Sequence, residues 1–102
     1  MIIIVNMDID DYNKIKHKEL FGESIICDKG FIHASTKEQF KLIATRFENM
    51  QDKTLILEIN VDKLKSQVKW EFSSKFNDNF PHIYGLINNS AVEKAYLLKY
   101  MK

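Results

Sequence analysis

The segment TLILEINV, residues 54–61, is the most regular stretch of the chain and decides the fold class. Apolar side chains recur at every second position, which is the period of a β-strand with one face turned toward a core. The residues on that face are Leu55, Leu57, Ile59 and Val61. Because Ile56 on the other face is also apolar, we expect partial cover there too. The segment therefore predicts a strand with one buried face and a partly covered second face.

A helix is predicted just before this strand, over residues 37–50. Its apolar positions follow the i, i+3, i+4, i+7 spacing of an amphipathic helix, at Phe40, Ile43, Ala44 and Phe47. Two overlapping capping boxes precede it, Ser35-x-x-Glu38 and Thr36-x-x-Gln39. Either box satisfies free backbone N–H groups of the first turn, so the start of the helix is clearly marked.

The rest of the chain reads as short strands and one further helix. Asp8 is placed to cap a helix that runs to about Leu20. Further strands are predicted at residues 2–5, 68–72, 80–86 and 91–100; the last is ambiguous with a helix, and its alternation favours a closing strand. Residues 24–32 are predicted as two short extended pieces around a turn at 28–30. About five or six strands with two main helices make a compact α+β fold, a single domain over residues 1–102.

Composition excludes several classes of protein. The chain has 15 basic and 14 acidic residues, so its net charge is +1. Nucleic-acid binding usually shows a basic stripe, and this balance therefore argues against such a partner. Cys27 is the single cysteine, which excludes an intrachain disulfide. With no signal-peptide pattern and only short apolar runs, we expect a cytoplasmic protein with no membrane partner; a protein partner stays open.

The motif GFIHAST, residues 30–36, runs from a predicted strand into the start of the 37–50 helix. Backbone N–H groups in the first turn of a helix attract phosphate or carboxylate. His33 can add a donor to such an anion, and Ser35 and Thr36 can add hydroxyl groups. The alternative is that both hydroxyls only cap the helix. The motif makes His33, Ser35 and Thr36 candidate ligand-binding residues.

Two further motifs are WEF at residues 70–72 and FPHIYG at residues 80–85. Together they contain a carboxylate, an imidazole and a phenol, surrounded in sequence by aromatic side chains. Apolar walls with a few polar groups are typical of a small-molecule pocket. Glu71 and His82 are a candidate acid–base pair, and Glu71 can instead hold a ribose hydroxyl. Trp70 and Tyr84 are candidates to stack on a ligand ring. The competing interpretation is that these aromatics are core residues and that Glu71 faces water.

Metal and cysteine chemistry receive less support from the sequence. A zinc site of His33, His82 and Glu71 is conceivable, but no pair of ligands has the spacing of a standard zinc motif, and no metal is predicted. Cys27 lies beside isoleucines, where a lone cysteine is more typical of buried packing than of a nucleophile.

Taken together, these motifs resemble domain-of-unknown-function family 952. Its small bacterial members carry Gly-Phe-Ile-His-x-Ser and, later, Phe-Pro-His-x-Tyr-Gly. The matching parts of this sequence are GFIHAST, Gln39, KWE at residues 69–71, FPHIYG and Ala91-Val92. The resemblance covers roughly Ile2 to Leu98. Its first strand differs from the typical aromatic-bearing one, because the residues here are Ile3-Ile4-Val5-Asn6.

The resemblance implies a fold grouped with ADP-ribosyltransferase-like domains, in which mainly antiparallel strands form a split or curved sheet. NAD binds those domains in a cleft between two small sheets. By this likeness His33 and Ser35 hold the nicotinamide ribose and amide, and Glu71 orients a ribose hydroxyl and stabilises an oxocarbenium-like transition state.

The leading expectation is therefore an ADP-ribosyl or related glycosyl transferase with NAD as its nucleotide-like ligand. Glu71, His82 and His33 are its expected catalytic residues, and His33, Ser35, Thr36, Trp70 and Tyr84 are expected to bind the ligand. The alternative is a non-catalytic module that binds a small ligand or a protein in the same cleft. A third possibility, removal of a 2′-phosphate from RNA as in some relatives by fold, is disfavoured by the net charge.

Overall fold

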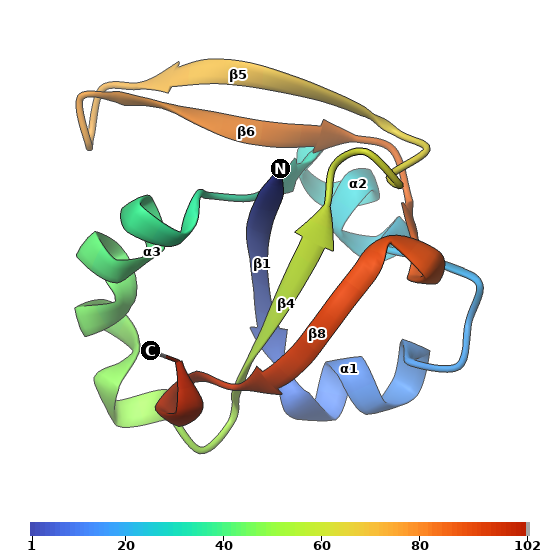
Figure 1. Cartoon of the computed structure of the whole chain (residues 1–102), viewed down its shortest axis with the longest axis horizontal. Helices are drawn as coiled ribbons and strands as arrows, with labels where there is room; N and C mark the ends of the chain where they lie inside the picture. The colour runs from blue at the N-terminus through green and yellow to red at the C-terminus, as the bar shows by residue number, and fades with distance from the viewer. Residues whose placement is uncertain (102) are drawn as a thin grey trace.

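The 54–61 segment forms the central strand β4 (Thr54–Asn60) of a three-stranded sheet. In the computed structural model, which describes residues 1–101 apart from the side chain of Glu48, β4 lies between β1 (Ile2–Asp8) and β8 (Val92–Leu97). Both pairings are antiparallel. The predicted closing strand is thus confirmed as β8, and Figure 1 shows it beside β4.

A second three-stranded sheet has the order β3-β6-β5, again antiparallel. Its strands are β3 (Ile32–His33), β6 (Asp78–Tyr84) and β5 (Gln67–Ser73). Strands β5 and β6 form a long hairpin that crosses the top of Figure 1. A third, two-stranded sheet pairs β2 (Leu20–Phe21) with β7 (Ile87–Asn88). The expected α+β class with antiparallel strands in separate sheets is confirmed.

The two larger sheets are joined through Ala34 and Ser35. Ser35 forms an isolated antiparallel bridge with Ile4 of β1, through hydrogen bonds of 2.6 and 3.0 Å. The backbone N–H of Ala34 donates to the carbonyl of Pro81 in β6 at 3.1 Å. The GFIHAST motif therefore connects β6 of one sheet to β1 of the other, and a site between the sheets is built around it.

Within residues 1–101 there are three α-helices, one more than predicted. They are α1 (Ile9–Ile15), α2 (Glu23–Lys29) and α3 (Lys37–Ile43). Three 3₁₀ segments accompany them: η1 (Ala44–Met50), η2 (Asn89–Ala91) and η3 (Leu98–Tyr100). The predicted 37–50 helix is thus α-helical only to Ile43 and continues as η1. No helix of the described chain is long and apolar enough to cross a membrane.

The prediction for residues 24–32 was wrong, because most of this segment is α2 rather than two extended pieces. Gly22 and Gly30 bound the helix, with φ of 109° and 82°, a region that side-chain-bearing residues rarely adopt. Ile25 and Ile26 pack against the core, so contacts made elsewhere in the fold decide the local conformation. Cys27 is exposed on this helix, which contradicts the expected buried packing.

The core lies on both sides of the β1–β4–β8 sheet, as the alternation in β4 predicted. One buried cluster contains Leu55, Leu57 and Ile59 together with residues of β1, β2, β3, β6 and β7. The other contains Ile56 with Phe40 of α3 and Leu98 of η3. Successive side chains of a strand point to opposite faces, which explains why one strand supplies both clusters.

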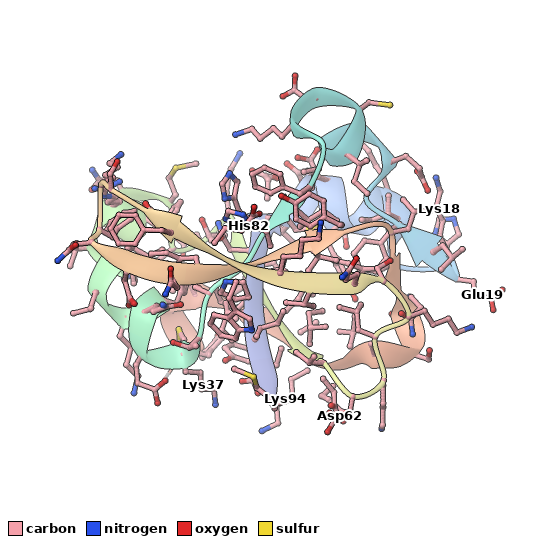
Figure 2. All side chains as sticks on the ribbon, turned by 90° about the horizontal axis from the view of Figure 1, so that it is seen from above. Lys18, Glu19, Lys37, Asp62, His82 and Lys94 are labelled. Atoms are coloured by element: carbon pink, nitrogen blue, oxygen red, sulfur yellow. The ribbon has the colours of Figure 1, made fainter. Side chains whose placement is uncertain are left out.

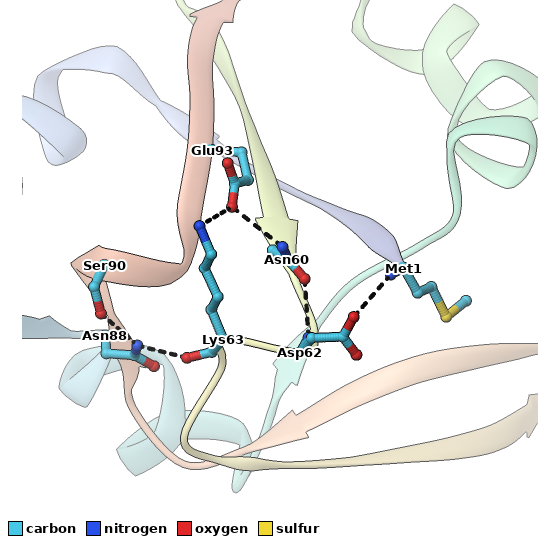
Figure 3. Close-up of polar contacts among 7 residues, drawn as sticks. All are labelled: Met1, Asn60, Asp62, Lys63, Asn88, Ser90 and Glu93. Atoms are coloured by element: carbon cyan, nitrogen blue, oxygen red, sulfur yellow. Dashed lines mark hydrogen bonds and ion pairs between the residues drawn. The ribbon is translucent and has the colours of Figure 1, made fainter.

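A polar network holds the loop after β4 against η2 and β8 (Figure 3). Asn88 is fully buried and donates to the carbonyl of Lys63 at 2.9 Å and to Ser90 Oγ at 2.8 Å, while its own oxygen accepts from the backbone N–H of Lys65. Lys63 Nζ also pairs with Glu93 at 3.0 Å. Since every polar atom of Asn88 is used, this network has a structural role.

Candidate functional site

Strand register brings the histidines of the two motifs together. His82 of β6 pairs with His33 of β3 on one side and with Lys69 of β5 on the other, so the three form one row across the sheet. Glu71 is two residues from Lys69, and Tyr84 is two residues from His82. Because side chains alternate along a strand, all five point to the same face. Four predicted site residues therefore share one surface.

Glu71 contacts two of the other side chains on this face through one carboxylate oxygen. Its Oε1 lies 2.8 Å from His82 Nδ1, and the Tyr84 hydroxyl donates to the same oxygen through a short hydrogen bond. The ammonium of Lys69 lies 4.8 Å from the centre of the Tyr84 ring. Glu71 and His82 are thus in hydrogen-bond contact, and their role as an acid–base pair stays a prediction. The pairing uses Nδ1 of His82 and leaves Nε2 without a hydrogen-bond partner among the described residues.

Phe31 covers the two histidines and the tyrosine. Its ring stacks on His82 at 4.2 Å between centroids, with an interplanar angle of 17°. It lies 4.9 Å from His33 and 5.4 Å from Tyr84. The His33 and His82 rings are perpendicular at 5.0 Å. Figure 2 shows His82 among ring side chains between the hairpin and α2, so aromatic packing limits the orientations of its imidazole.

These contacts shift three pKa values. The hydrogen bonds from Tyr84 and then His82 lower the pKa of Glu71, because they stabilise the carboxylate. The same bond to Glu71 raises the pKa of Tyr84, which keeps the phenol protonated. Partial desolvation, followed by the positive charges of His82 and Lys29, lowers the pKa of His33. At neutral pH the site therefore holds a carboxylate, a neutral phenol and a neutral His33.

Both histidines also line a cavity of about 720 Å³. One wall is the tip of the β5–β6 hairpin, from Phe72 to Phe76, and another is formed by Ile43, Arg46 and Phe47 of α3 and η1. The floor includes Ile4 and Asn6 of β1. The cavity thus lies between the two larger sheets, where the family resemblance led us to expect a cleft.

The charged side chains that line this cavity are all basic. Lys29, Arg46 and Lys75 line it together with His33 and His82, and the described lining residues include no aspartate or glutamate. Ser35, Ser73 and Ser74 add hydroxyl groups. In a chain with nearly equal numbers of acidic and basic residues, this arrangement favours an anionic ligand.

The other predicted ligand-binding residues occupy three different positions. Ser35 is buried and lines the cavity. Thr36 caps α3: its Oγ1 accepts from Gln39 N at 3.1 Å, and Gln39 Oε1 accepts from Thr36 N at 2.9 Å. Trp70 pairs with Pro81 and alternates with Glu71, so it lies on the opposite face of the sheet and is 46% exposed. Neither Thr36 nor Trp70 is among the lining residues.

Some residues of the site were missed by the sequence analysis. Phe31 stands inside the GFIHAST motif, but nothing in the pattern indicated that it would stack on His82. Arg46 is the only arginine of the chain and lies on the polar side of a predicted helix, which is also how a solvated charge looks. Lys29 was expected in a turn, and Phe76 was not assigned to any element. No group of three or more His, Cys, Asp or Glu within the described chain is arranged to hold a metal ion.

A second polar cluster lies away from this site. Glu58 of β4 is 6% exposed, and its Oε2 accepts from the Tyr96 hydroxyl at 2.6 Å and lies 3.4 Å from Lys37 Nζ. These residues, with Lys94 and Tyr100, surround a smaller cavity of about 230 Å³. Figure 2 shows Lys37 and Lys94 on the opposite side of the hairpin from His82 in that view.

Comparisons with known proteins agree with this fold. A crystal structure of protein CC0527 from Caulobacter crescentus has a TM-score of 0.78 and 26% identity, covering 95% of this chain and 85% of that one. A solution NMR structure of CC0527 gives a TM-score of 0.76 at 26% identity, with coverage of 95% and 84%. No curated protein matches significantly. The family profile described as "Protein of unknown function (DUF952)" matches residues 7–95, and the chain therefore belongs to the DUF952 family.

Proposed function

We propose that this protein is a small ADP-ribosyltransferase-like enzyme that binds an NAD-like nucleotide in the 720 Å³ cavity and transfers its ribosyl group. The observation that carries the proposal is the placement of His82. Its Nδ1 is held by Glu71, its ring is stacked by Phe31, and the side chain lines a cationic cavity between two sheets. An imidazole held at one nitrogen is oriented to exchange a proton at the other.

The proposed reaction replaces one bond to the ribose C1′ with another. The oxygen of an acceptor hydroxyl or of water forms a bond to C1′, while the bond from C1′ to the nicotinamide nitrogen breaks. The bonding electrons leave with nicotinamide, which becomes neutral, and the acceptor proton passes to Nε2 of His82. His33 and Ser35 line the same cavity and bind the ligand. Such proton transfer typically contributes 10²–10⁴-fold to the rate.

Glu71 has a positioning role in this scheme. It is not among the residues that line the cavity, and its Oε1 is shared by His82 and Tyr84. A carboxylate on Nδ1 fixes the tautomer of the imidazole and stabilises its protonated form. Thr36 holds the start of α3 and so supports the neighbouring Ser35. Trp70 has no part, because it lies on the other face of the sheet.

A direct test is release of nicotinamide from NAD by the purified protein, followed by chromatography. His82→Gln should reduce the rate by about 10²–10⁴-fold. Glu71→Gln should reduce it by a smaller factor, and the melting temperature of this variant should stay within a few degrees. His17→Gln, at an exposed histidine after α1, is the matched control and should leave the rate unchanged. Equal rates for His82→Gln and the unmodified protein would refute the proposed proton transfer.

A non-catalytic binding module is the second candidate, and one observation favours it. The cavity has no described carboxylate in its lining, so no residue there is placed to stabilise an oxocarbenium-like transition state directly. A module predicts NAD binding by calorimetry with no nicotinamide released after long incubation. An enzyme predicts both.

A further inference from the structure

We infer that the outer part of the cavity, between the hairpin tip and η1, is a subsite for the base and phosphate of a nucleotide. This inference rests on the proposed function, because it concerns the same ligand. It goes further by assigning the two halves of the cavity to different parts of that ligand. The inner half, at His33 and His82, receives the reacting ribose, and the outer half receives an aromatic base with its phosphate.

The two halves are separated along β6. His82 lies four residues from Asp78, where the strand leaves the hairpin turn, and this corresponds to about 13 Å of extended chain. Phe80 lies between them on the same face and lines the cavity. The hairpin therefore spans both halves, so a ligand lying along it can contact the histidines and the tip at once.

Aromatic surface is exposed in the outer half. Phe76 is 37% exposed, although it lines the cavity. The guanidinium of Arg46 lies 4.8 Å from the centre of the Phe76 ring, and Phe80 lies 5.4 Å from it on a tilted plane. Exposed aromatic rings beside a planar cation are the usual means by which proteins stack a base.

Asp78, the carboxylate at the start of β6, does not compensate the positive charges of the outer half. Arg46 and Lys75 both lie near the Phe76 ring, and Lys29 lines the same cavity. Asp78 begins β6 beside the tip, but its Oδ2 accepts from Gln39 Nε2 at 3.0 Å and its Oδ1 accepts from the backbone N–H of Asn79. These two bonds lower the pKa of Asp78 and hold its carboxylate at the start of α3. The cations thus remain available for a phosphate.

The smaller cavity offers a contrast that supports this reading. It also has two lysines and two tyrosines, but buried Glu58 accepts from Tyr96 and pairs with Lys37 at its centre. The charge of Lys37 is therefore matched inside the fold. Among the described residues, only the cavity at the hairpin tip has the guanidinium of Arg46 beside an exposed aromatic ring.

Calorimetry with three probes tests the assignment: adenosine 5′-monophosphate (AMP), adenosine and ribose 5-phosphate. AMP should bind the unmodified protein at least tenfold more tightly than either of the others, because only AMP has both the base and the phosphate. Phe76→Leu should weaken AMP and adenosine by about tenfold and leave ribose 5-phosphate unchanged. Arg46→Gln should weaken AMP and ribose 5-phosphate more than adenosine.

Two matched controls lie on the surface away from the cavity. Tyr100→Leu removes another exposed aromatic ring, and Lys41→Gln removes another exposed cation near α3. Both should leave all three affinities unchanged. Equal affinity of the unmodified protein for AMP and ribose 5-phosphate would overturn the base subsite, and so would an affinity for AMP that Phe76→Leu does not change.

The outcomes separate this inference from the proposed function. If AMP binding follows the predicted pattern but no nicotinamide is released from NAD, the subsite stands and the enzymatic proposal fails. If His82-dependent release is observed and Phe76→Leu changes neither KM nor AMP affinity, the enzyme stands and the subsite fails. If none of the probes binds and NAD is not turned over, both are wrong.

Discussion

The chain contains two glutamate–tyrosine pairs that are chemically alike and differently placed. Glu58 and Tyr96 lie in the β1–β4–β8 sheet with Lys37 as the attached cation. Glu71 and Tyr84 lie in the β3–β6–β5 sheet with His82 as the attached base. Each carboxylate accepts a hydrogen bond from a phenol, and each has one nitrogen-bearing partner. The two pairs differ in burial and in the nitrogen-bearing partner, which is an ammonium in one pair and an imidazole in the other.

Glu58 is nearly inaccessible, whereas the Glu71 side chain is 42% exposed. Burial, and then the hydrogen bond to Glu58, raises the pKa of Tyr96 well above its ordinary value, so this phenol stays protonated at any physiological pH. The Glu58 cluster is thus a buried carboxylate held by a phenol and an ammonium. The Glu71 cluster instead holds an imidazole, the side chain that enzymes most often use to transfer protons. The same residue types thus stabilise the fold in one sheet and are suited to chemistry in the other.

The largest expected effect on stability comes from removing the buried carboxylate. Glu58→Ala should lower the free energy of unfolding by about 2–4 kcal/mol, because it leaves the Tyr96 hydroxyl and Lys37 without their partner and opens a void. Glu71→Ala is the matched substitution and should shift the melting temperature by only a few degrees. Denaturant unfolding of both variants measures the difference. Equal destabilisation would mean that the contrast between the two pairs is not real.

Removing one phenol hydroxyl should have a smaller effect. Tyr96→Phe should cost about 1–2 kcal/mol, since a hydrogen bond to a buried charged group is lost while Lys37 still pairs with Glu58. Tyr84→Phe should leave stability nearly unchanged and should raise the pKa of Glu71, because the Tyr84 bond is the largest cause that lowers it. Carboxyl carbon shifts followed by NMR report that pKa. An unchanged Glu71 titration in Tyr84→Phe would show that the bond does not form in solution.

Removing the ammonium that pairs with Glu58 should lower the free energy of unfolding by less than either of the preceding substitutions in this cluster. The Lys37 side chain is partly exposed, so Lys37→Met should lower stability by less than about 1 kcal/mol. Lys41→Met on the same helix is the control, since that ammonium makes no ion pair within the described chain, and it should have no effect. A loss for Lys37→Met as large as that for Glu58→Ala would show that the ion pair, rather than the phenol bond, holds the buried carboxylate.

The smallest expected effect is a pH dependence from His33. Its pKa is lowered in the folded protein by desolvation and by the charges of His82 and Lys29. The unfolded state therefore binds more protons below about pH 6.5, and stability is full above that value and falls as the pH drops toward the folded pKa of His33. His33→Gln should flatten this slope, whereas His17→Gln should not. An imidazole NMR titration of His33 at or above its ordinary pKa would contradict the expectation.

Local patterns were sufficient for much of the fold. The alternation of Leu55, Leu57 and Ile59 predicted the central strand, and the Thr36–Gln39 capping box marked the start of α3, as observed. The pattern failed at residues 24–32, where Ser-Ile-Ile suits a helix or a strand equally well. Packing of Ile25 and Ile26 against the core settles that choice, and such long-range contacts are absent from local sequence.

The candidate site was predicted in part for the same reason. Motif chemistry named Glu71, His82 and Tyr84. Strand alternation places His82 and Tyr84 on one face of β6, but only the pairing register of the hairpin adds Glu71 of β5 to that face. Trp70 was named for its ring, but it has the opposite parity to Glu71 and faces away from the site. Arg46 and Phe76 could not be assigned, because they meet only when the hairpin tip is placed beside η1.

The sequence by itself determined the five longer strands, the capped start of α3 and the residue types that make up the two motifs. These features depend on side-chain period and on hydrogen bonds within a few residues, both of which can be read locally. Only the tertiary structure decided that His33 lies beside His82, since their contact depends on the pairing of β3 with β6 across almost fifty residues. It also decided which glutamate is buried and which is exposed. Burial depends on the elements that pack over a strand, and those come from elsewhere in the chain.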